Sequence, residues 1–236
     1  MLPWKSIATA EAPDGTALEL RRRGDEYLIA ADGHDLMSSD DGDSARALAD
    51  LGCAHIAAGD PARVLVGGLG MGYTLRAALA CVGPAAVVEV AELVAAVAEW
   101  NRVELAGLAG HPLRDPRSRL QVGDVRAPIR AARAHYDAIL LDVDNGPDAL
   151  AHAANETLYS AAGLTAAREA LRPGGVLAVW SFSDDPRFTR RLERAGFVVR
   201  VHRVSGSRRG RGRHHRVWVA RRTEPDDVRS GRRNRS

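Results

Sequence analysis

The stretch that decides the fold is VLVGGLGMG, residues 64–72. An apolar run rich in β-branched residues ends in alternating glycines, and a helical pattern starts at once at Tyr73. Glycine has no Cβ atom, so this turn can adopt positive φ and let the backbone approach a ligand closely. The N-terminus of the next helix offers N–H groups to polar ligand atoms. The stretch therefore predicts a strand, a ligand-binding turn and a helix, with a ligand at Gly68, Gly70, Met71 and Gly72.

On the C-terminal side of this stretch, strand and helix patterns alternate through a domain that spans residues 61–222. Their spacing is typical of βαβ units, which build a parallel sheet with helices on both faces. We expect strands at 63–67, 85–90, 119–122, 136–142 and 175–182, and helices at 73–82, 91–102, 125–134, 157–171 and 186–195.

The end of this domain has a different pattern. Strands are expected at 197–204 and 216–220, and the loop between them is too short for a crossover helix, so they should be antiparallel. A mostly parallel, Rossmann-like, seven-stranded α/β sheet with an antiparallel C-terminal hairpin is the class I methyltransferase fold. The common nicotinamide dehydrogenase fold has parallel strands throughout, so the hairpin excludes it.

Residues 1–60 do not share the alternation and predict a small N-terminal β-hairpin region. Short strands are expected at 17–22 and 26–30, joined by the turn Gly24-Asp25. Ser44 can cap a short helix at 45–51. At the other end, residues 223–236 form a polar, basic tail without apolar anchors, which we expect to be disordered.

The composition limits the classes of partner and the compartment. No apolar run reaches the ~18 residues that a membrane span needs, and the first residues lack a secretory pattern. Cys53 and Cys81 lie in apolar helical stretches without metal-ligand spacing, which favours two reduced thiols in the cytoplasm. We therefore expect a cytoplasmic protein without a membrane partner and without a metal.

The positive charge lies at the C-terminal end of the chain. Residues 206–236 carry eleven Arg against three acidic residues, and the other residues have a net charge of −5. Of the 33 basic residues 32 are Arg, which indicates compositional bias. The loop 208–215 resembles an RGG-type segment but lacks interleaved aromatic residues, and His214-His215 has no further ligand at metal spacing. We therefore do not expect nucleic acid as a partner.

Two acidic positions fit a nucleoside ligand. Glu89 is expected to end the second strand, 17 residues after Gly72, where a carboxylate accepts hydrogen bonds from both ribose hydroxyls. Asp124 follows the third strand and can accept the exocyclic amine of adenine, while the Val125 N–H bonds a ring nitrogen. The alternatives are a helix N-terminal acid at Glu89 and an N-cap at Asp124.

A second pair of acidic residues points to an amine. The apolar strand 136–142 delivers Asp142 to the carboxyl edge of the sheet, where open α/β sheets bind ligands, and Asp144 follows two residues later. Two carboxylates at a site mouth suit a cationic substrate, and one can take the proton that an attacking amine loses. The alternative is a turn with solvated acids.

Over residues 32–204, the sequence resembles the spermidine synthase (polyamine aminopropyltransferase) family. Thr74-Leu75-Arg76 follows the glycine turn as in that family, and Pro173-Gly174-Gly175 precedes the fifth strand. Glu89 matches the family's ribose-binding acid, Asp124 its adenine-binding Asp, and Asp142 its catalytic Asp. The resemblance implies transfer of an aminopropyl group from decarboxylated S-adenosylmethionine to a small amine such as putrescine, with Asp142 as base. It also implies a homodimer.

The half of the family pattern that binds the polyamine is incomplete here. Met71 stands where the family has an Asp that binds the donor's terminal amine, Leu36 replaces a Gln, and Asn145 replaces a second Asp, although Asp144 is adjacent. Two other functions therefore remain open. One is a methyltransferase that uses intact S-adenosylmethionine, whose carboxylate an Asp at position 71 would repel. The other is a nucleoside-binding relative without catalysis.

Overall fold

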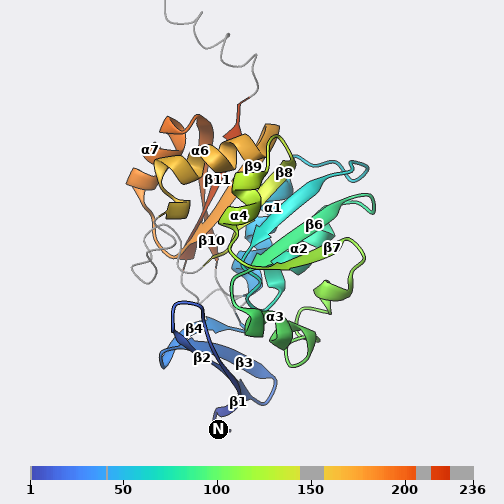
Figure 1. Ribbon diagram of the computed structural model, residues 1–236, viewed down its shortest axis with the longest axis vertical. Helices are drawn as coiled ribbons and strands as arrows, with labels where there is room; N and C mark the ends of the chain where they lie inside the picture. The colour runs from blue at the N-terminus through green and yellow to red at the C-terminus, as the bar shows by residue number, and fades with distance from the viewer. Residues whose placement is uncertain (1, 41, 144–156, 206–213, 224–236) are drawn as a thin grey trace, which may run out of the picture.

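The computed structural model describes residues 2–40, 42–143, 157–205 and 214–223. Its larger sheet has seven strands in the order β10-β11-β9-β8-β5-β6-β7, and only β11 runs against its neighbours (Figure 1). This topology confirms the predicted mostly parallel α/β sheet with an antiparallel C-terminal hairpin. The strands are β5 (Arg63–Gly67), β6 (Val87–Glu92), β7 (Ser118–Val122), β8 (Tyr136–Leu141), β9 (Leu171–Ser181), β10 (Phe197–Ser205) and β11 (His214–Arg222).

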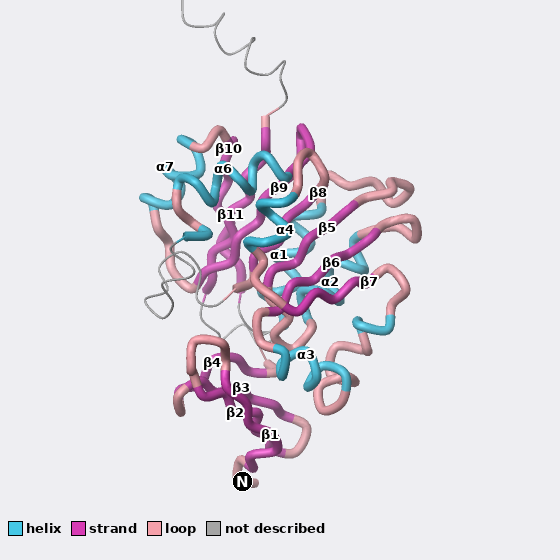
Figure 2. Tube along the Cα trace, viewed as in Figure 1, coloured by secondary structure: helices cyan, strands magenta, loops and turns pink. Residues whose placement is uncertain are grey.

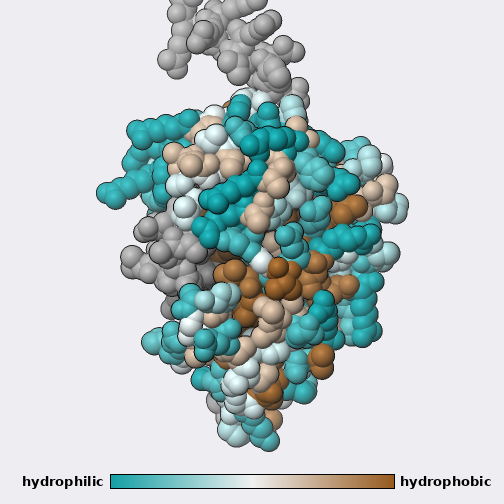
Figure 3. All heavy atoms as spheres, in the orientation of Figure 1, coloured by the Kyte–Doolittle hydropathy of each residue, from teal (hydrophilic) through white to brown (hydrophobic). Residues whose placement is uncertain are grey.

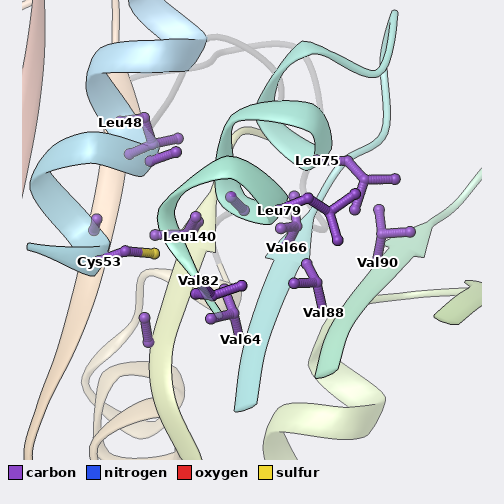
Figure 4. Close-up of a cluster of buried hydrophobic side chains, with 14 of the residues drawn as sticks. Leu48, Cys53, Val64, Val66, Leu75, Leu79, Val82, Val88, Val90 and Leu140 are labelled. Carbon is purple, nitrogen blue, oxygen red and sulfur yellow. The ribbon is translucent and has the colours of Figure 1, made fainter. Parts of the chain in front are cut away.

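Helices cover both faces of this sheet (Figure 2). One face carries α1 (Gly42–Cys53), α2 (Tyr73–Cys81) and α3 (Ala95–Arg102), and the other carries α4 (Arg126–Ala131), α6 (Ala161–Ala170) and α7 (Pro186–Arg194). Each layer buries its own apolar cluster, because successive side chains of a strand point to opposite faces. Figure 4 shows the α1–α2 cluster, in which Leu79 lies beside Val66 of β5 and Leu75 beside Val90 of β6.

The N-terminal region is a separate antiparallel sheet in the order β1-β2-β3-β4. The predicted hairpin is β2 (Ala17–Arg23) and β3 (Glu26–Ala31), but β1 (Lys5–Glu11) and β4 (His34–Ser38) were not predicted. Both extra strands expose much of their surface, so they lack the regular apolar alternation that indicates a strand. The sheet packs against α3 and the glycine turn through a third apolar cluster.

Several element boundaries differ from the prediction. β6 continues to Glu92, so α3 starts at Ala95 and not at residue 91. Helix α1 runs from Gly42 to Cys53, so Ser44 lies inside the helix and does not cap it, and Gly52 does not end it. Gly52 packs closely there, since a Cβ atom would lie 2.3 Å from Cδ2 of Leu140. β9 starts at Leu171, so the Pro-Gly-Gly segment lies inside the strand and not before it.

Three predictions fall on other parts of the chain. Asp144, most of the Arg-rich loop and residues 224–236 of the basic tail lie outside the described residues. Within the described part, every helix is too short or too polar to cross a membrane. The described residues also contain no group of three or more His, Cys, Asp or Glu side chains placed to hold a metal ion.

Candidate nucleoside and amine site

The glycine turn between β5 and α2 has a backbone that requires glycine. Gly68, Gly70 and Gly72 have φ values of +87°, +51° and +84°. A Cβ atom on Gly68 would lie 2.3 Å from the carbonyl oxygen of Asp142, and one on Gly70 would lie 2.6 Å from Cε of Met37. The left-handed conformation therefore disfavours side chains at all three positions, and at Gly68 the backbone of Asp142 also leaves no space for one.

Neighbouring segments hold this turn from several sides. The amide of Gly68 donates to the carbonyl of Ala91 at 2.9 Å, and the amide of Asp142 donates to the carbonyl of Gly67 at 2.9 Å. From α3, Nδ2 of the buried Asn101 donates to the carbonyl of Gly70 at 2.7 Å. We did not predict Asn101 as a site residue. The sequence feature that could have identified it is an Asn on the same helix face as the buried Trp100 and Val97, because Asn is unfavourable inside a helix.

Glu92 is the carboxylate that meets the turn. It ends β6 and is only 7% exposed. Its Oε2 atom accepts the amide of Leu69 at 2.8 Å, and its Oε1 atom accepts the amide of Val94 at 2.9 Å. Two backbone amides therefore hold this carboxylate at the turn. Glu92 follows Gly72 by about 20 residues, which is the usual spacing between the glycine turn and the ribose-binding acid in nucleotide-binding βαβ folds.

Glu89 does not end the second strand, which corrects the prediction. It is the third residue of β6, and its carboxylate accepts the hydroxyl of Tyr136 at 2.9 Å and lies 3.4 Å from Nη1 of Arg63. Arg63 and Tyr136 are the first residues of their strands, so this cluster lies toward the opposite, amino edge of the sheet. Burial and the bond to Glu89 raise the pKa of Tyr136. Glu89 thus joins a polar cluster away from the turn.

Met71 belongs to the turn, but its side chain points away from a ligand. It is 1% exposed and packs with Leu20, Ile29 and Trp100 in the cluster between the N-terminal sheet and α3. The prediction that Met71 contacts the ligand can therefore hold only for its backbone. An Asp at this position would be buried among apolar side chains, so the chain offers no carboxylate here for a donor's terminal amine.

Asp142 follows β8 and lies against the turn, as predicted. The hydroxyl of Thr74, in the first turn of α2, donates to Oδ2 of Asp142. Thr74 is 2% exposed, so this bond is shielded from water and fixes the carboxylate at the carboxyl edge of the sheet. Asp142 as a residue is only partly buried. Asp142 is therefore held in position and is accessible to a substrate.

Asp124 lies at the same edge, after β7, but an arginine binds its carboxylate. Oδ1 accepts the amide of Arg126 at 2.8 Å, and Oδ2 accepts Nε of the same residue at 2.7 Å. Partial burial raises the pKa of Asp124, but the hydrogen bonds from Arg126 outweigh it and hold that pKa below its ordinary value. The N-cap residue of α4 is Val125, which makes no side-chain bond, but the Asp124 carboxylate caps the first amide of the helix through Arg126, as the capping alternative expected. The Val125 side chain packs into the core.

Exposed apolar side chains line this edge between the turn and Asp124. Leu93, directly after β6, is 49% exposed, and Val122, at the end of β7, is 51% exposed. Figure 3 shows apolar surface where the larger domain meets the N-terminal sheet. Apolar walls beside a few fixed polar groups are typical of small-molecule sites. A candidate nucleoside site therefore lies at this edge, formed by the glycine turn together with Glu92, Leu93, Asp124 and Asp142.

Comparisons with known proteins show what the chain is similar to. No family model matches the chain. A polyamine aminopropyltransferase of Korarchaeum cryptofilum is 30% identical over 52% of this chain and 36% of its own length. Polyamine aminopropyltransferase 2 of Pseudomonas aeruginosa is 34% identical over 56% of this chain and 38% of its own length. The chain thus matches little more than a third of either relative.

A solved structure covers more of the chain. The spermidine synthase of Thermotoga maritima superimposes on 95% of this chain and 78% of its own with a TM-score of 0.71, at 21% sequence identity. This likeness confirms the fold, and the curated relatives confirm the resemblance to the spermidine synthase family.

Proposed function

We propose that this protein transfers an aminopropyl group from decarboxylated S-adenosylmethionine to an amine. The observation that carries the proposal is the position of Asp142, fixed by Thr74 beside the glycine turn. The named relatives, both polyamine aminopropyltransferases, support the same chemistry. The donor supplies a carbon activated by its sulfonium group. The amine nitrogen attacks that carbon, the C–S bond breaks with its electrons going to sulfur, and methylthioadenosine leaves.

The chain's own residues would bind the donor's nucleoside and receive the proton. Glu92 would accept the ribose hydroxyls, and Leu93 and Val122 would flank the adenine. Asp142 would accept a hydrogen bond from the amine and take its proton, and a positioned base of this kind contributes about 10²–10⁴-fold to a rate. Asp124 can bind adenine only while it shares its carboxylate with Arg126.

Met71 supports a second candidate function. Because its side chain is apolar and buried, the site lacks an acid at that position that would repel the carboxylate of intact S-adenosylmethionine. Methyl transfer from intact S-adenosylmethionine therefore stays open. A cytoplasmic location, which the two free thiols favour, and a homodimer are further parts of the proposal.

The test compares both donors with the purified protein. Release of methylthioadenosine from the decarboxylated donor, only when an amine is present, is the expected result. Release of S-adenosylhomocysteine from the intact donor would replace the proposal by methyl transfer. Asp142→Asn should lower kcat by about 10²–10⁴-fold and leave donor affinity nearly unchanged. The matched control is Asp137→Asn in the same strand. It should lower stability, because it weakens the ion pair with Arg172, but the folded protein should keep its kcat and its donor affinity.

A further inference from the structure

Three aromatic rings gather at the carboxyl end of β9, next to Asp142. The Trp180 and Phe182 rings lie 4.6 Å apart between centroids, and His215 of β11 lies 4.9 Å from Trp180 and 5.1 Å from Phe182. Phe182 is 41% exposed, whereas His215 is 4% exposed. The buried ring of His215 and the partly buried ring of Trp180 thus support an exposed one, and we call these three residues the aromatic cluster.

The strand register places this cluster beside Asp142. Leu141 of β8 pairs with Val179 of β9, so Asp142 and Trp180 leave neighbouring strands at the same level. They also share a face: Trp180 packs on the α1–α2 cluster, and Thr74 of α2 binds Asp142. Moving outward from the glycine turn, the edge therefore presents a carboxylate first and aromatic rings next.

The carboxylates that flank the rings are already paired. Asp184 lies 3.2 Å from Nε of Arg216, and Asp185 accepts the amide of Arg187 and lies 3.2 Å from Arg191. A second ammonium group of a diamine would have to compete with Arg216 and Arg191 for these carboxylates, and its attraction to an exposed ring face is weak. An apolar or aromatic group gains contact area and ring–ring attraction instead.

We infer that Phe182 and Trp180 select the acceptor, and that it is a monoamine with an apolar or aromatic end rather than an aliphatic diamine. The amino group would face Asp142 and the apolar end would lie on the aromatic cluster. This inference rests on the proposed aminopropyl transfer, because it assigns the acceptor half of the same site. It makes Phe182 a specificity residue without a part in proton transfer.

The experiment measures methylthioadenosine release from the decarboxylated donor with 2-phenylethylamine, n-butylamine and 1,4-diaminobutane. The wild type should show its highest kcat/KM with 2-phenylethylamine. Phe182→Leu should lower that value about 3- to 10-fold, the worth of one aromatic contact. Phe182→Tyr, which keeps the ring, should retain it. Val201→Ala on β10 is the control, since Val201 is equally exposed at 40% but lies on another strand.

The outcomes separate this inference from the proposed function. If 1,4-diaminobutane is the best acceptor, or if Phe182→Leu changes all three amines equally, the inference is wrong while the transfer reaction stands. If no amine releases methylthioadenosine, the proposed transfer is wrong. Equilibrium dialysis of 2-phenylethylamine then decides the inference: binding that is lost in Phe182→Leu supports it, and no binding to the wild type refutes it.

Discussion

At the scale of single residues, two carboxylates three positions apart in one strand have different surroundings. Glu92 bonds the backbone of the glycine turn, and Glu89 bonds Tyr136 near the amino edge. Because strand residues three apart point to opposite faces, only one of them can meet a ligand in the turn. The glutamate at the end of the strand is the one that reaches the turn, and β6 ends at Glu92.

Glu92→Gln should therefore weaken binding of methylthioadenosine, measured by isothermal titration. The expected loss is about 10- to 100-fold in Kd, because a hydrogen bond to a charged group is worth about 1.5–3 kcal/mol. Glu89→Gln is the matched control and should bind the nucleoside like the wild type. Equal losses in both variants would contradict the assignment of the ribose position to Glu92.

A second residue-scale prediction concerns the glycines. Gly15 and Gly68 have nearly equal φ values of +89° and +87°, but a Cβ atom would meet nothing within 4 Å at Gly15. Gly15→Ala should cost only the left-handed backbone, about 1–2 kcal/mol of unfolding free energy. Gly68→Ala should cost at least about 1 kcal/mol more, because its Cβ atom meets the backbone of Asp142. Urea unfolding measures both, and equal losses would show that the turn has room.

At the scale of elements, the N-terminal sheet and α3 enclose the turn. Met71→Asp restores the residue type of the spermidine synthase pattern but would bury a carboxylate among Leu20, Ile29 and Trp100. We expect it to lower the free energy of unfolding by about 2 kcal/mol or more, without gain in donor affinity. Met71→Leu, which nearly keeps the volume, should cost less than about 1.5 kcal/mol. Tighter donor binding in a stable Met71→Asp protein would refute this packing argument.

The loop before β7 gives a prediction about pH. Hydrogen bonds from Arg117 hold the pKa of Asp115 below its ordinary value, and Arg117 also donates to the carbonyl of Val82 at 2.8 Å. A lowered folded-state pKa adds stability above the unfolded-state pKa near 4, and this stability is lost as pH falls through the folded value. Asp115→Asn should thus be less stable than the wild type at pH 7, and the difference should shrink as the pH falls below about 4 and through the lowered pKa of Asp115.

Arg117→Met separates the two roles of this arginine. It should lose the pH-dependent bond to Asp115 and the pH-independent bond to Val82, so it should remain less stable than the wild type at low pH. Thermal unfolding across pH measures both variants. A constant difference between Asp115→Asn and the wild type at every pH would contradict the assigned pairing.

At the scale of the whole molecule, the third apolar cluster joins the two sheets. Leu20 of β2 is fully buried and shares this cluster with Val97 and Leu105 of the larger domain. Leu20→Ala should lower the free energy of unfolding by about 2–5 kcal/mol, in a single transition seen alike by circular dichroism and tryptophan fluorescence. Ile7→Ala on β1, where the side chain is 40% exposed, should change it little. An early separate transition in Leu20→Ala would show that the sheets unfold independently.

The same scale explains what the sequence could and could not predict. The glycine turn and the spacing of the strands depend on local patterns, so the sheet and the position of Asp142 could be predicted. The end of β6 could not be located, because its last residues, Ala91 and Glu92, are good helix formers. Burial of Met71 depends on a sheet more than thirty residues earlier in the chain, and no local pattern records that contact.

The bonds around the glycine turn have a consequence for the thermodynamics of binding. Glu92, Asn101 and the backbone of Asp142 already fix its conformation without a ligand. A ligand that enters such a preorganised turn orders little of the chain, so little conformational entropy opposes its binding. Most of the favourable contact free energy of a nucleoside then appears as affinity. The donor can therefore bind even where the amine half of the site is weak or altered.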